Sequence, residues 1–375
     1  MELRDIIIRE IREHGPLTFH DYMERALYYP GLGYYNSPGE KIGKGGDFFT
    51  SPAYTGLFGE MIGKQIAEMI SLCGGNKKFT ILEFGAGQGL LCHDILTYLW
   101  NETPYGSRIQ YCILEKSSEL RRRQQERLPK QVRWIDDVTE LIPFNGCMLA
   151  NEVLDNFAVH IVKKEAGTLW ELHVDYKEGE LVEGWQPASA QMYNYVEALQ
   201  VDIPDGCRVE VNLEALLWLE RISQVVEKGF IVLVDYGGTS RELYTTARNT
   251  GTLLCFHKHQ INFDPFRNIG RQDITAQVNF SAIADCAGKY GLQLAGYTSQ
   301  ANFLLALGFS AQLRKLEMAG RDNPGLAKQL DLIQTFFLEM GTKIKVLIFQ
   351  KGFEKFHLTG MQFPDLKLRV SRQRV

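Results

Sequence analysis

The sequence predicts an α/β protein built on a doubly wound, mostly parallel, Rossmann-like sheet of seven strands. Strand-like apolar runs alternate with helical segments, which is the pattern of a parallel sheet covered by helices. Polar residues follow these runs, and ligands bind along the carboxyl edge of such sheets. The expected strands contain the runs 80–82, 110–114, 132–135, 146–150, 229–234, 292–298 and 343–350.

The chain of 375 residues is longer than a bare nucleotide-binding domain, so additions to one core are expected. We expect an N-terminal helical cap or lid over 1–78, a core over 79–352 and a C-terminal tail over 353–375. Two insertions interrupt the core. The first, at about 159–200, has the pattern of an antiparallel meander, and the second, at about 239–280, is too long for an ordinary connection. Together they predict an inserted subdomain on the substrate side.

The composition excludes several classes of protein. The chain is 45% hydrophobic and 23% charged, and its formal net charge of −4 lacks the basic excess of an electrostatically driven nucleic-acid binder. No apolar run is long enough to cross a bilayer, so no membrane partner is expected. The seven cysteines contain no C-x-x-C pair, which favours a reducing compartment and predicts no metal site. Because the N-terminus reads as an amphipathic helix rather than a signal peptide, we expect a cytoplasmic, bacterial protein.

The most informative stretch is the loop after the first core strand. Glu83 ends the apolar run, and Gly85, Gly87 and Gly89 follow it. Glycine permits positive φ and lets a ligand approach the backbone closely. A dinucleotide fingerprint needs a glycine at the sixth position, where this chain has Leu90. The acid and the G-x-G-x-G spacing therefore favour an S-adenosylmethionine (SAM) loop.

Acids also follow the next two expected strands. Glu115 comes directly after the run 110–114, where a carboxylate can accept hydrogen bonds from both ribose hydroxyls of a nucleoside; a solvated acid at a strand end is the alternative. Asp136 and Asp137 follow the run 132–135. One of these two is expected to accept a hydrogen bond from the adenine amino group, and capping of the next helix is the alternative for either.

The fourth run leads into Asn151, Glu152 and Asp155. Glu152 and Asp155 lie three residues apart where a methyl acceptor would meet the cofactor, so we assign them to catalysis. Acids in the first turn of a helix are the alternative explanation. Glu210 interrupts an apolar strand pattern, so we expect it either to point into a cleft or to lie on an exposed edge.

The turn at 45–52 combines a short acid, paired aromatic rings and hydroxyls ahead of a helix. Asp47, Phe48 and Thr50 are therefore candidates for a lid over the mouth of the active site. A helix cap formed by Thr50 or Ser51 is compatible with that role.

These motifs resemble those of the MidA-like SAM-dependent methyltransferases, which include the mitochondrial complex I assembly factor that methylates an arginine of a complex I subunit. The resemblance extends from about Gly15 to Gly352. It rests on segments that occur in the same order, namely 29–35, 46–52, 83–89, Glu115, 151–155, 235–237 and 272–275.

The resemblance implies an enzyme that uses SAM, releases S-adenosyl-L-homocysteine (SAH) and methylates an arginine of a partner protein such as a subunit of a complex I-type respiratory enzyme. It places Gln88 with the loop glycines in the cofactor site, and Asn151 in both the cofactor site and the catalytic site. Asp235, Tyr236 and Asp273 are then substrate-side residues. A homodimer is compatible with this reading.

Three alternatives stay open. They are a small-molecule methyltransferase, a SAM-binding assembly factor with little turnover and, least favoured, an NAD(P)-dependent oxidoreductase. The chain departs from the family pattern at Ala158, where a proline is usual, and at Gln277 and Asn279, where a histidine and an acid are usual. The last two adjoin the presumed substrate face, so they bear on the identity of the substrate.

Overall fold

The computed structural model describes residues 2–38, 41, 52, 55–75, 77–141, 143–319, 324–354, 356–365, 367 and 368. The chain divides into two compact units. The core unit comprises 49–153, 220–236 and 287–375, and the meander unit comprises 1–48, 154–219 and 237–286. The predicted cap over 1–78 is thereby shared between the two units.

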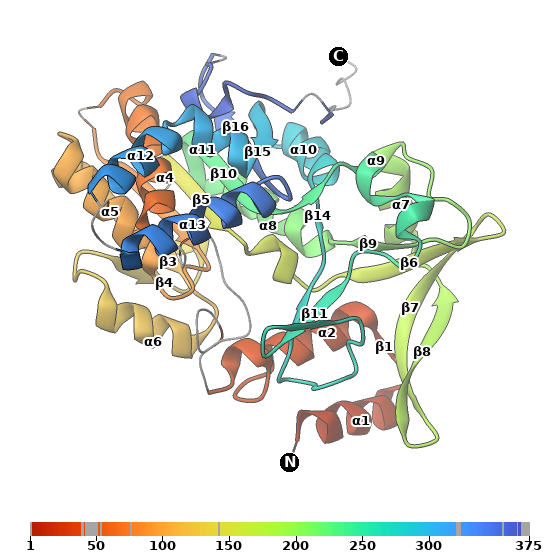
Figure 1. Cartoon of the computed structure of the whole chain (residues 1–375). Coiled ribbons are helices and arrows are strands. Elements are labelled where there is room, and N and C mark those ends of the chain that lie inside the picture. The colour runs from red at the N-terminus through yellow and green to blue at the C-terminus, as the bar shows by residue number, and fades with distance from the viewer. Residues whose placement is uncertain are drawn as a thin grey trace. The chain divides into compact units, whose positions relative to one another are not determined.

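The sheet of the core unit contains a path of strands in which each of the expected runs is found (Figure 1). In spatial order they are β15 (Gln293–Ser299), β16 (Ile344–Lys351), β10 (Val226–Gly238), β5 (Phe144–Asn151), β2 (Phe79–Phe84), β3 (Ile109–Leu114) and β4 (Arg133–Ile135). β10, β5, β2, β3 and β4 pair in parallel, whereas β16 pairs antiparallel with both β10 and β15. The sheet is therefore mixed, because β16 runs against its neighbours.

The inner strands are apolar because both of their faces are covered. In β5, the residues from Cys147 to Ala150 are all buried, which is the near-continuous pattern of a strand inside a parallel sheet. Parallel pairing also brings the residues that follow β2, β3, β4 and β5 to the same edge. The sequence-predicted cofactor residues of the core unit lie at this edge.

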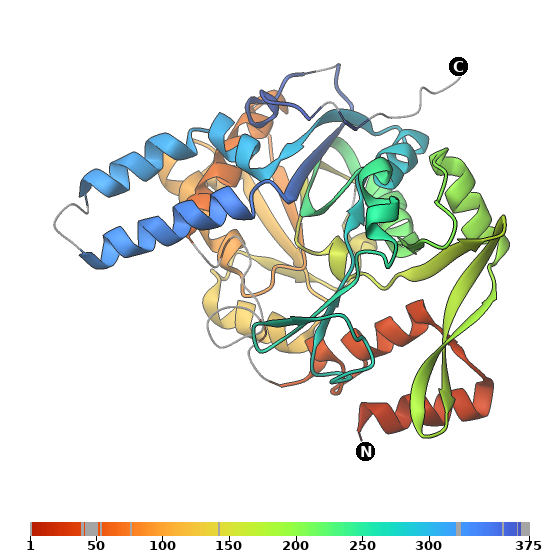
Figure 2. The ribbon, with the colours of Figure 1, turned by 45° about the vertical axis from the view of Figure 1, so that its right-hand side comes forward.

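One face of the sheet is covered by α4 (Gly56–Leu72), α5 (Leu90–Glu102), α11 (Gln300–Ala306), α12 (Phe309–Ala319) and α13 (Pro324–Glu339). Alternate strand residues, such as Ile81, Cys147 and Val232, belong to the hydrophobic cluster that these helices complete. Figure 2 shows α12 and α13 side by side. A further helix, α6 (Ser118–Arg127), links β3 to β4. Ser117 caps its N-terminus, because the Ser117 side chain accepts the Leu120 N–H.

Two glycines set the distance between α4 and α5. A Cβ atom at Gly59 would lie 2.4 Å from Asp94 Cβ, and one at Gly63 would lie 2.8 Å from Tyr98 Cδ1. Larger residues at either position would push the two helices apart.

Helix α4 begins after Thr55, which caps its N-terminus, because the Thr55 side chain accepts the Leu57 N–H at 3.2 Å.

The meander unit is built on an antiparallel sheet. Its strands follow the order β1 (Leu17–Thr18), β7 (Thr168–Lys177), β6 (His160–Glu165) and β9 (Arg208–Val211), and β8 (Glu180–Pro187) pairs with β7. The expected antiparallel meander is confirmed by β6, β7 and β8. Helix α7 (Ala190–Leu199) follows them, and its Met192 and Tyr195 pack on Leu169 and Val209 of the sheet.

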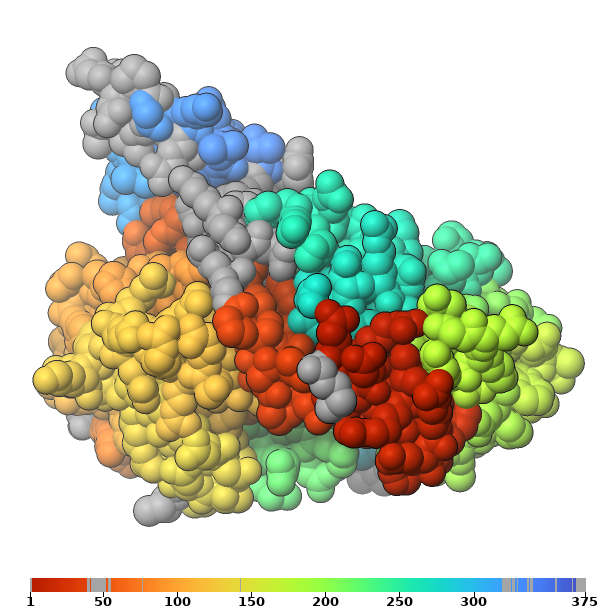
Figure 3. Space-filling model, turned by 90° about the horizontal axis from the view of Figure 1, so that it is seen from below, coloured from red at the N-terminus to blue at the C-terminus, as the bar shows by residue number. Residues whose placement is uncertain are grey.

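Two N-terminal helices, α1 (Leu3–His14) and α2 (Phe19–Tyr28), contact β7 of this sheet. In Figure 3 they are the red residues that lie against the yellow-green residues of the meander. Thr18 caps α2, because its Oγ1 atom accepts the Asp21 N–H at 3.1 Å.

The long insertion at 239–280 has its own secondary structure. β12 (Gln260–Asn262), β11 (Leu254–His257) and β13 (Asp273–Thr275) form a small sheet, and α9 (Ser240–Leu243) precedes it. β14 (Val278–Asn279) pairs with the last two residues of β10. Elsewhere, α8 (Leu213–Val225) precedes β10 and α10 (Phe280–Lys289) precedes β15. Across the ranges that the structure describes, no helix is long and apolar enough to span a membrane.

The contact between β5 and β2 generates a first prediction. A Cβ atom at Gly146 would lie 1.9 Å from the Thr80 carbonyl oxygen, so Gly146→Ala must push two core strands apart. We expect the free energy of unfolding to fall by about 1–3 kcal/mol, measured by urea denaturation. Gly184→Ala in β8 is the control, because its nearest neighbour would be 3.8 Å away, and it should change stability by less than about 0.5 kcal/mol. Equal stability of the two variants would contradict the prediction.

Candidate functional site

The glycine loop after β2 has the backbone that its sequence predicts. Gly85, Gly87 and Gly89 have φ angles of 64°, 54° and 77°, in the left-handed region that favours glycine. Gly85 donates its N–H to the Leu114 carbonyl at 2.9 Å, and Gly89 forms the N-cap of α5. A Cβ atom at Gly85 would also lie 2.9 Å from a methyl group of Val153. The loop therefore presents backbone rather than side chains at the start of a helix, where a ligand can approach closely.

Glu115 is held by a hydrogen-bond network that the sequence did not predict. Its carboxylate accepts the Ser117 N–H at 3.0 Å and the Gln124 side-chain amide at 2.9 Å. The same Gln124 nitrogen donates to the Gly87 carbonyl at 2.9 Å, and the Trp134 indole donates to the Gln124 oxygen at 3.0 Å. Gln124 is fully buried. It therefore ties the acid after β3 to the glycine loop, and burial raises the pKa of Glu115 despite these donors.

Glu83 lies in the sheet and is 2% exposed. Its carboxylate accepts the Tyr111 hydroxyl at 2.8 Å. Burial raises the pKa of Glu83 to about 7, with the Tyr111 hydrogen bond opposing and the charge of Glu115 adding to the shift. This acid can therefore change its protonation state near neutral pH.

The two acids after β4 differ. Asp137 caps the short helix Val138–Glu140 by accepting the Thr139 N–H at 2.8 Å, so the capping alternative applies to it. Asp136 is exposed and forms an ion pair with Arg121. Glu140 accepts the backbone N–H groups of both aspartates, which completes a capping box. A contact of either acid with adenine stays a prediction.

Strand β5 ends in an unusual backbone. Glu152 has a φ of 54°, which is uncommon for a residue with a side chain, and its N–H donates to the Val234 carbonyl at 2.8 Å. The next residue, Val153, donates its N–H to the buried carboxylate of Asp235 at 3.1 Å. Asp235 therefore braces this turn by accepting a backbone N–H group. Among the described residues, the buried Asn151 side-chain oxygen has no hydrogen-bond donor.

In the meander unit, a second group of buried polar residues surrounds Asp273. Its carboxylate accepts the Tyr35 hydroxyl at 2.9 Å and the Asn156 amide at 3.2 Å. Asp155 is buried in the short helix Leu154–Asn156, and its carbonyl accepts the Ala276 N–H at 2.9 Å. Burial, followed by the charge of Asp273, raises the pKa of Tyr35, and Asp155 adds to the shift.

Glu210 is buried in β9 rather than at an exposed edge, so that alternative is wrong. Its carboxylate accepts the N–H groups of Thr252 and Leu253 at 2.7 and 3.2 Å, and the Thr252 hydroxyl at 3.0 Å. Burial raises its pKa. Through these hydrogen bonds, Glu210 fastens the loop after Gly251 to β9. Position 251 needs a glycine, because an added Cβ would lie 2.2 Å from the Glu210 carboxylate.

The departures from the family pattern have local roles. The side-chain oxygen of Asn279 accepts the N–H groups of Ser281 and Ala282 at 3.1 and 3.2 Å, which caps α10. An aspartate offers the same acceptor, so this departure preserves the cap. The Gln277 side chain accepts a hydrogen bond from Arg248 at 2.7 Å, and Ala158 is fully buried.

The structure thus brings the glycine loop, Glu115 and Glu83 together in the core unit, with Asn151 and Glu152 at the end of β5. Tyr236 follows Asp235 in β10 and donates its backbone N–H to that acid at 2.8 Å. Gln88 lies within the loop, and its carbonyl accepts a hydrogen bond from Arg127 at 2.8 Å. Asp47, Phe48 and Thr50 lie outside the described residues. No cluster of His, Cys, Asp and Glu suited to a metal ion occurs in the part of the chain that the structure covers.

A family model matches residues 61–298, more than half of the chain, and is described as "Putative S-adenosyl-L-methionine-dependent methyltransferase". Two curated relatives carry a more specific name. Protein arginine methyltransferase NDUFAF7 homolog, mitochondrial, of Caenorhabditis elegans is 26% identical over 94% of this chain and 87% of its own length. Protein arginine methyltransferase NDUFAF7, mitochondrial, of Homo sapiens is 27% identical over 86% of this chain and 77% of its own length.

A solved structure resembles the whole chain. It is a protein from Burkholderia thailandensis that was crystallised with bound S-adenosyl-homocysteine. Its TM-score is 0.85 at 33% sequence identity, and the match covers 97% of this chain and 95% of that one. The comparisons therefore decide between the two cofactor classes that the glycine loop left open, in favour of SAM.

The raised pKa of Glu83 predicts an unusual pH dependence of stability. Because the carboxyl group binds its proton more tightly in the folded chain than in the unfolded chain, its contribution is most favourable below pH 4.5 and is lost as the pH rises to about 7. Glu83→Gln cannot ionise. We therefore expect the variant to gain about 3 kcal/mol relative to the parent between pH 4.5 and pH 7.5, measured by urea denaturation of the ligand-free protein.

The control for this experiment is Glu126→Gln, which changes an exposed acid on α6. Its stability should follow the pH dependence of the parent. A constant difference between Glu83→Gln and the parent across this range would show that Glu83 is ionised throughout and would contradict the prediction.

Proposed function

Because this chain belongs to a family of SAM-dependent methyltransferases, we propose that it transfers the methyl group to an arginine side chain of a partner protein. The observation that carries the proposal is the turn after β5, where Glu152 is held with a φ of 54° beside Asn151. A carboxylate is the natural partner of a guanidinium group, which stays charged at physiological pH. The names of the curated relatives, which are protein arginine methyltransferases, support the same acceptor.

The residues present fit the cofactor. The left-handed backbone at Gly85, Gly87 and Gly89 leaves room for a ligand against the loop, and Gln88 lies inside it. We assign the ribose hydroxyls to Glu115, whose carboxylate Gln124 orients. The side-chain oxygen of Asn151 is a further acceptor. Asp136 and Asp137 remain the candidates for the adenine amino group, although Asp137 already caps a helix.

The cofactor supplies an electrophilic methyl carbon on a positively charged sulfur. Transfer forms a bond between an arginine nitrogen and that carbon, breaks the sulfur–carbon bond and releases one proton from the guanidinium group. Positioning of the acceptor supplies much of the acceleration in a displacement of this kind. Glu152 orients the guanidinium group and accepts the proton, and Asp235 positions Glu152 by holding the next residue, Val153. Asp155 is also proposed to be catalytic, because it belongs to the motif at 151–155.

The partner protein and the cellular location of the reaction are also part of this proposal. A subunit of a complex I-type respiratory enzyme is the partner we favour, because the sequence resembles a complex I assembly factor. The bacterial source of the solved relative supports a bacterial setting, and the scattered free cysteines support the cytoplasm. We also propose that the protein forms a homodimer. We further propose that the sheet is of the doubly wound, Rossmann-like type, which the strand order of the core unit supports.

Cofactor binding gives the next prediction. Glu115→Ala removes the proposed ribose acceptor, and we expect the affinity for SAH to fall about ten- to a hundredfold. Gln124→Met keeps the buried volume but removes the donors to Glu115 and Gly87, so it should weaken binding by a smaller factor. The measurement is calorimetric titration with SAM, SAH and NADH, with Glu126→Gln as the control. Unchanged SAH affinity in Glu115→Ala would contradict the assignment of the ribose.

The acceptor is tested by methyl transfer. Purified protein and SAM with a tritiated methyl group are incubated with extract from cells of the source organism that lack the gene. Acid hydrolysis and chromatography then identify the labelled amino acid. We expect labelled methylarginine, formed at least about tenfold more slowly by Glu152→Gln, because a positioned proton acceptor contributes at least that much.

Glu227→Gln is the matched control, because it changes an exposed acid in β10 that lies outside the motif. It should label arginine at the rate of the parent. Label in lysine, or only in small molecules, would contradict the arginine proposal and favour the small-molecule alternative. Tight SAM binding with no transfer to any acceptor would favour the assembly-factor alternative.

A further inference from the structure

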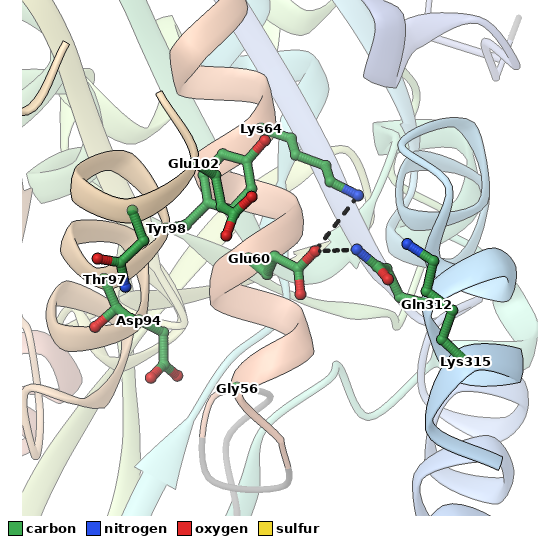
Figure 4. Close-up of a pocket in the computed structure, with 10 residues that line it drawn as sticks. Gly56, Glu60, Lys64, Asp94, Thr97, Tyr98, Glu102, Gln312 and Lys315 are labelled. Atoms are coloured by element: carbon green, nitrogen blue, oxygen red, sulfur yellow. Dashed lines mark hydrogen bonds and ion pairs between the residues drawn. The ribbon is translucent and has the colours of Figure 1, made fainter. Parts of the chain in front are cut away.

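A polar pocket of about 560 Å³ lies between α4, α5 and α12 of the core unit, and the proposed reaction does not use it (Figure 4). Its walls carry three acids, two lysines, an aromatic ring and several amide or hydroxyl groups. The charged and aromatic residues are Glu60 and Lys64 from α4, Asp94, Tyr98 and Glu102 from α5, and Lys315 from α12.

Two of the three acids have partners that explain them structurally. Glu60 accepts a hydrogen bond from Gln312 at 2.5 Å and pairs with Lys64 at 3.5 Å, as the dashed lines in Figure 4 show. The Asp94 carboxylate lies beside the first residue of α4, since a Cβ at Gly56 would be 3.5 Å from one of its oxygens. A negative charge is favourable at the N-terminus of a helix. Glu60 and Asp94 therefore help to hold the helices in place.

Glu102 has no such structural explanation. It is the last residue of α5, and it is exposed. A carboxylate at the C-terminus of a helix opposes the helix dipole, so a lysine or an amide would suit α5 better at this position. Residues that break a local rule of stability are expected at functional sites.

The Tyr98 side chain lies next to Glu102. Figure 4 shows these two α5 side chains close together, whereas the Glu60 carboxylate is directed toward Lys64 and Gln312. Burial, then the charge of Glu60 and then that of Glu102, raise the pKa of the Tyr98 hydroxyl. Glu60 is already paired with Lys64. The group left to receive a cation is the Glu102 carboxylate beside the Tyr98 ring, and a carboxylate with an aromatic ring is the chemistry that recognises a guanidinium or ammonium group.

We propose that this pocket docks a basic segment of the protein that is methylated, with an arginine or lysine side chain seated against Glu102 and the ring of Tyr98. The inference rests on the proposed function, because it requires a protein substrate. The volume is that of a site for a ligand larger than a single side chain. Lys315, on the α12 wall, can donate a hydrogen bond to a backbone carbonyl or a carboxylate of the same segment.

The place of Glu102 sets the spacing of such a segment. Helix α5 starts directly after Gly89 of the cofactor loop and has 13 residues, so its far end lies about 20 Å from the loop. An extended chain covers that distance with about six residues. A substrate segment that reaches from the cofactor loop to Glu102 therefore needs at least about six residues between these two points.

Peptide binding tests the proposal. The probe is a fluorescein-labelled peptide of alternating arginine and glycine, with a matched peptide in which neutral citrulline replaces arginine, and binding is followed by anisotropy at low ionic strength. We expect the arginine peptide to bind about three- to tenfold more weakly to Glu102→Gln and more weakly still to Glu102→Lys. Glu126→Gln, an exposed acid on α6, is the control and should bind like the parent.

Two further readouts separate docking from a structural role. Because the negative charge opposes the helix dipole, Glu102→Gln should melt at or above the temperature of the parent while it loses peptide affinity. In methyl transfer, it should raise KM for the protein substrate and leave kcat and the SAH affinity unchanged. An arginine peptide that binds Glu102→Lys as tightly as the parent, or a citrulline peptide that binds as tightly as the arginine peptide, would overturn the proposal.

The docking proposal and the proposed function fail in different ways. If methylarginine forms with the same KM in Glu102→Lys and in the parent, docking is overturned and the arginine methyltransferase stands. If no protein arginine is methylated although the peptide binds through Glu102, the proposed function is overturned and the pocket remains a site for basic peptides.

Discussion

Parallel pairing of β10, β5, β2, β3 and β4 is the constraint on which the candidate site depends. Because these strands run in one direction, the residues after them must emerge along a shared edge. Residues far apart in the sequence, such as Gly85, Glu115 and Glu152, acquire a common environment for this reason. The antiparallel strand β16 completes the sheet without contributing to that edge of parallel ends.

Buried polar side chains then fix the irregular segments that follow the strands. Gln124 holds the glycine loop and Glu115 together, Asp235 holds the turn after β5, and Glu210 holds the loop at Gly251. Each accepts or donates several hydrogen bonds, because a buried polar group without partners is costly. Loops braced in this way keep a defined shape, and a site that positions two reactants requires that.

Much of this could be predicted from local sequence. The strands follow from apolar runs, and the loop follows from glycines whose observed φ angles other residues avoid. The capping role of Asp137 could have been read from Glu140 three residues later. The role of Gln124 could not be predicted, because nothing in the local sequence distinguishes it from its neighbour Gln125 in a strongly charged helix. Only tertiary packing buries Gln124. The burial of Glu210 and the division of the N-terminal region likewise depend on partners that are distant in the chain.

The backbone of Glu152 has a consequence for how the protein can change. A residue with a side chain loses about 1–3 kcal/mol in a left-handed conformation, whereas glycine avoids that cost. Selection for thermal stability alone would therefore replace Glu152 with glycine and would discard the carboxylate at the end of β5. A thermostabilised descendant that keeps its activity must gain stability at other positions, because at position 152 thermal stability favours glycine and catalysis favours glutamate.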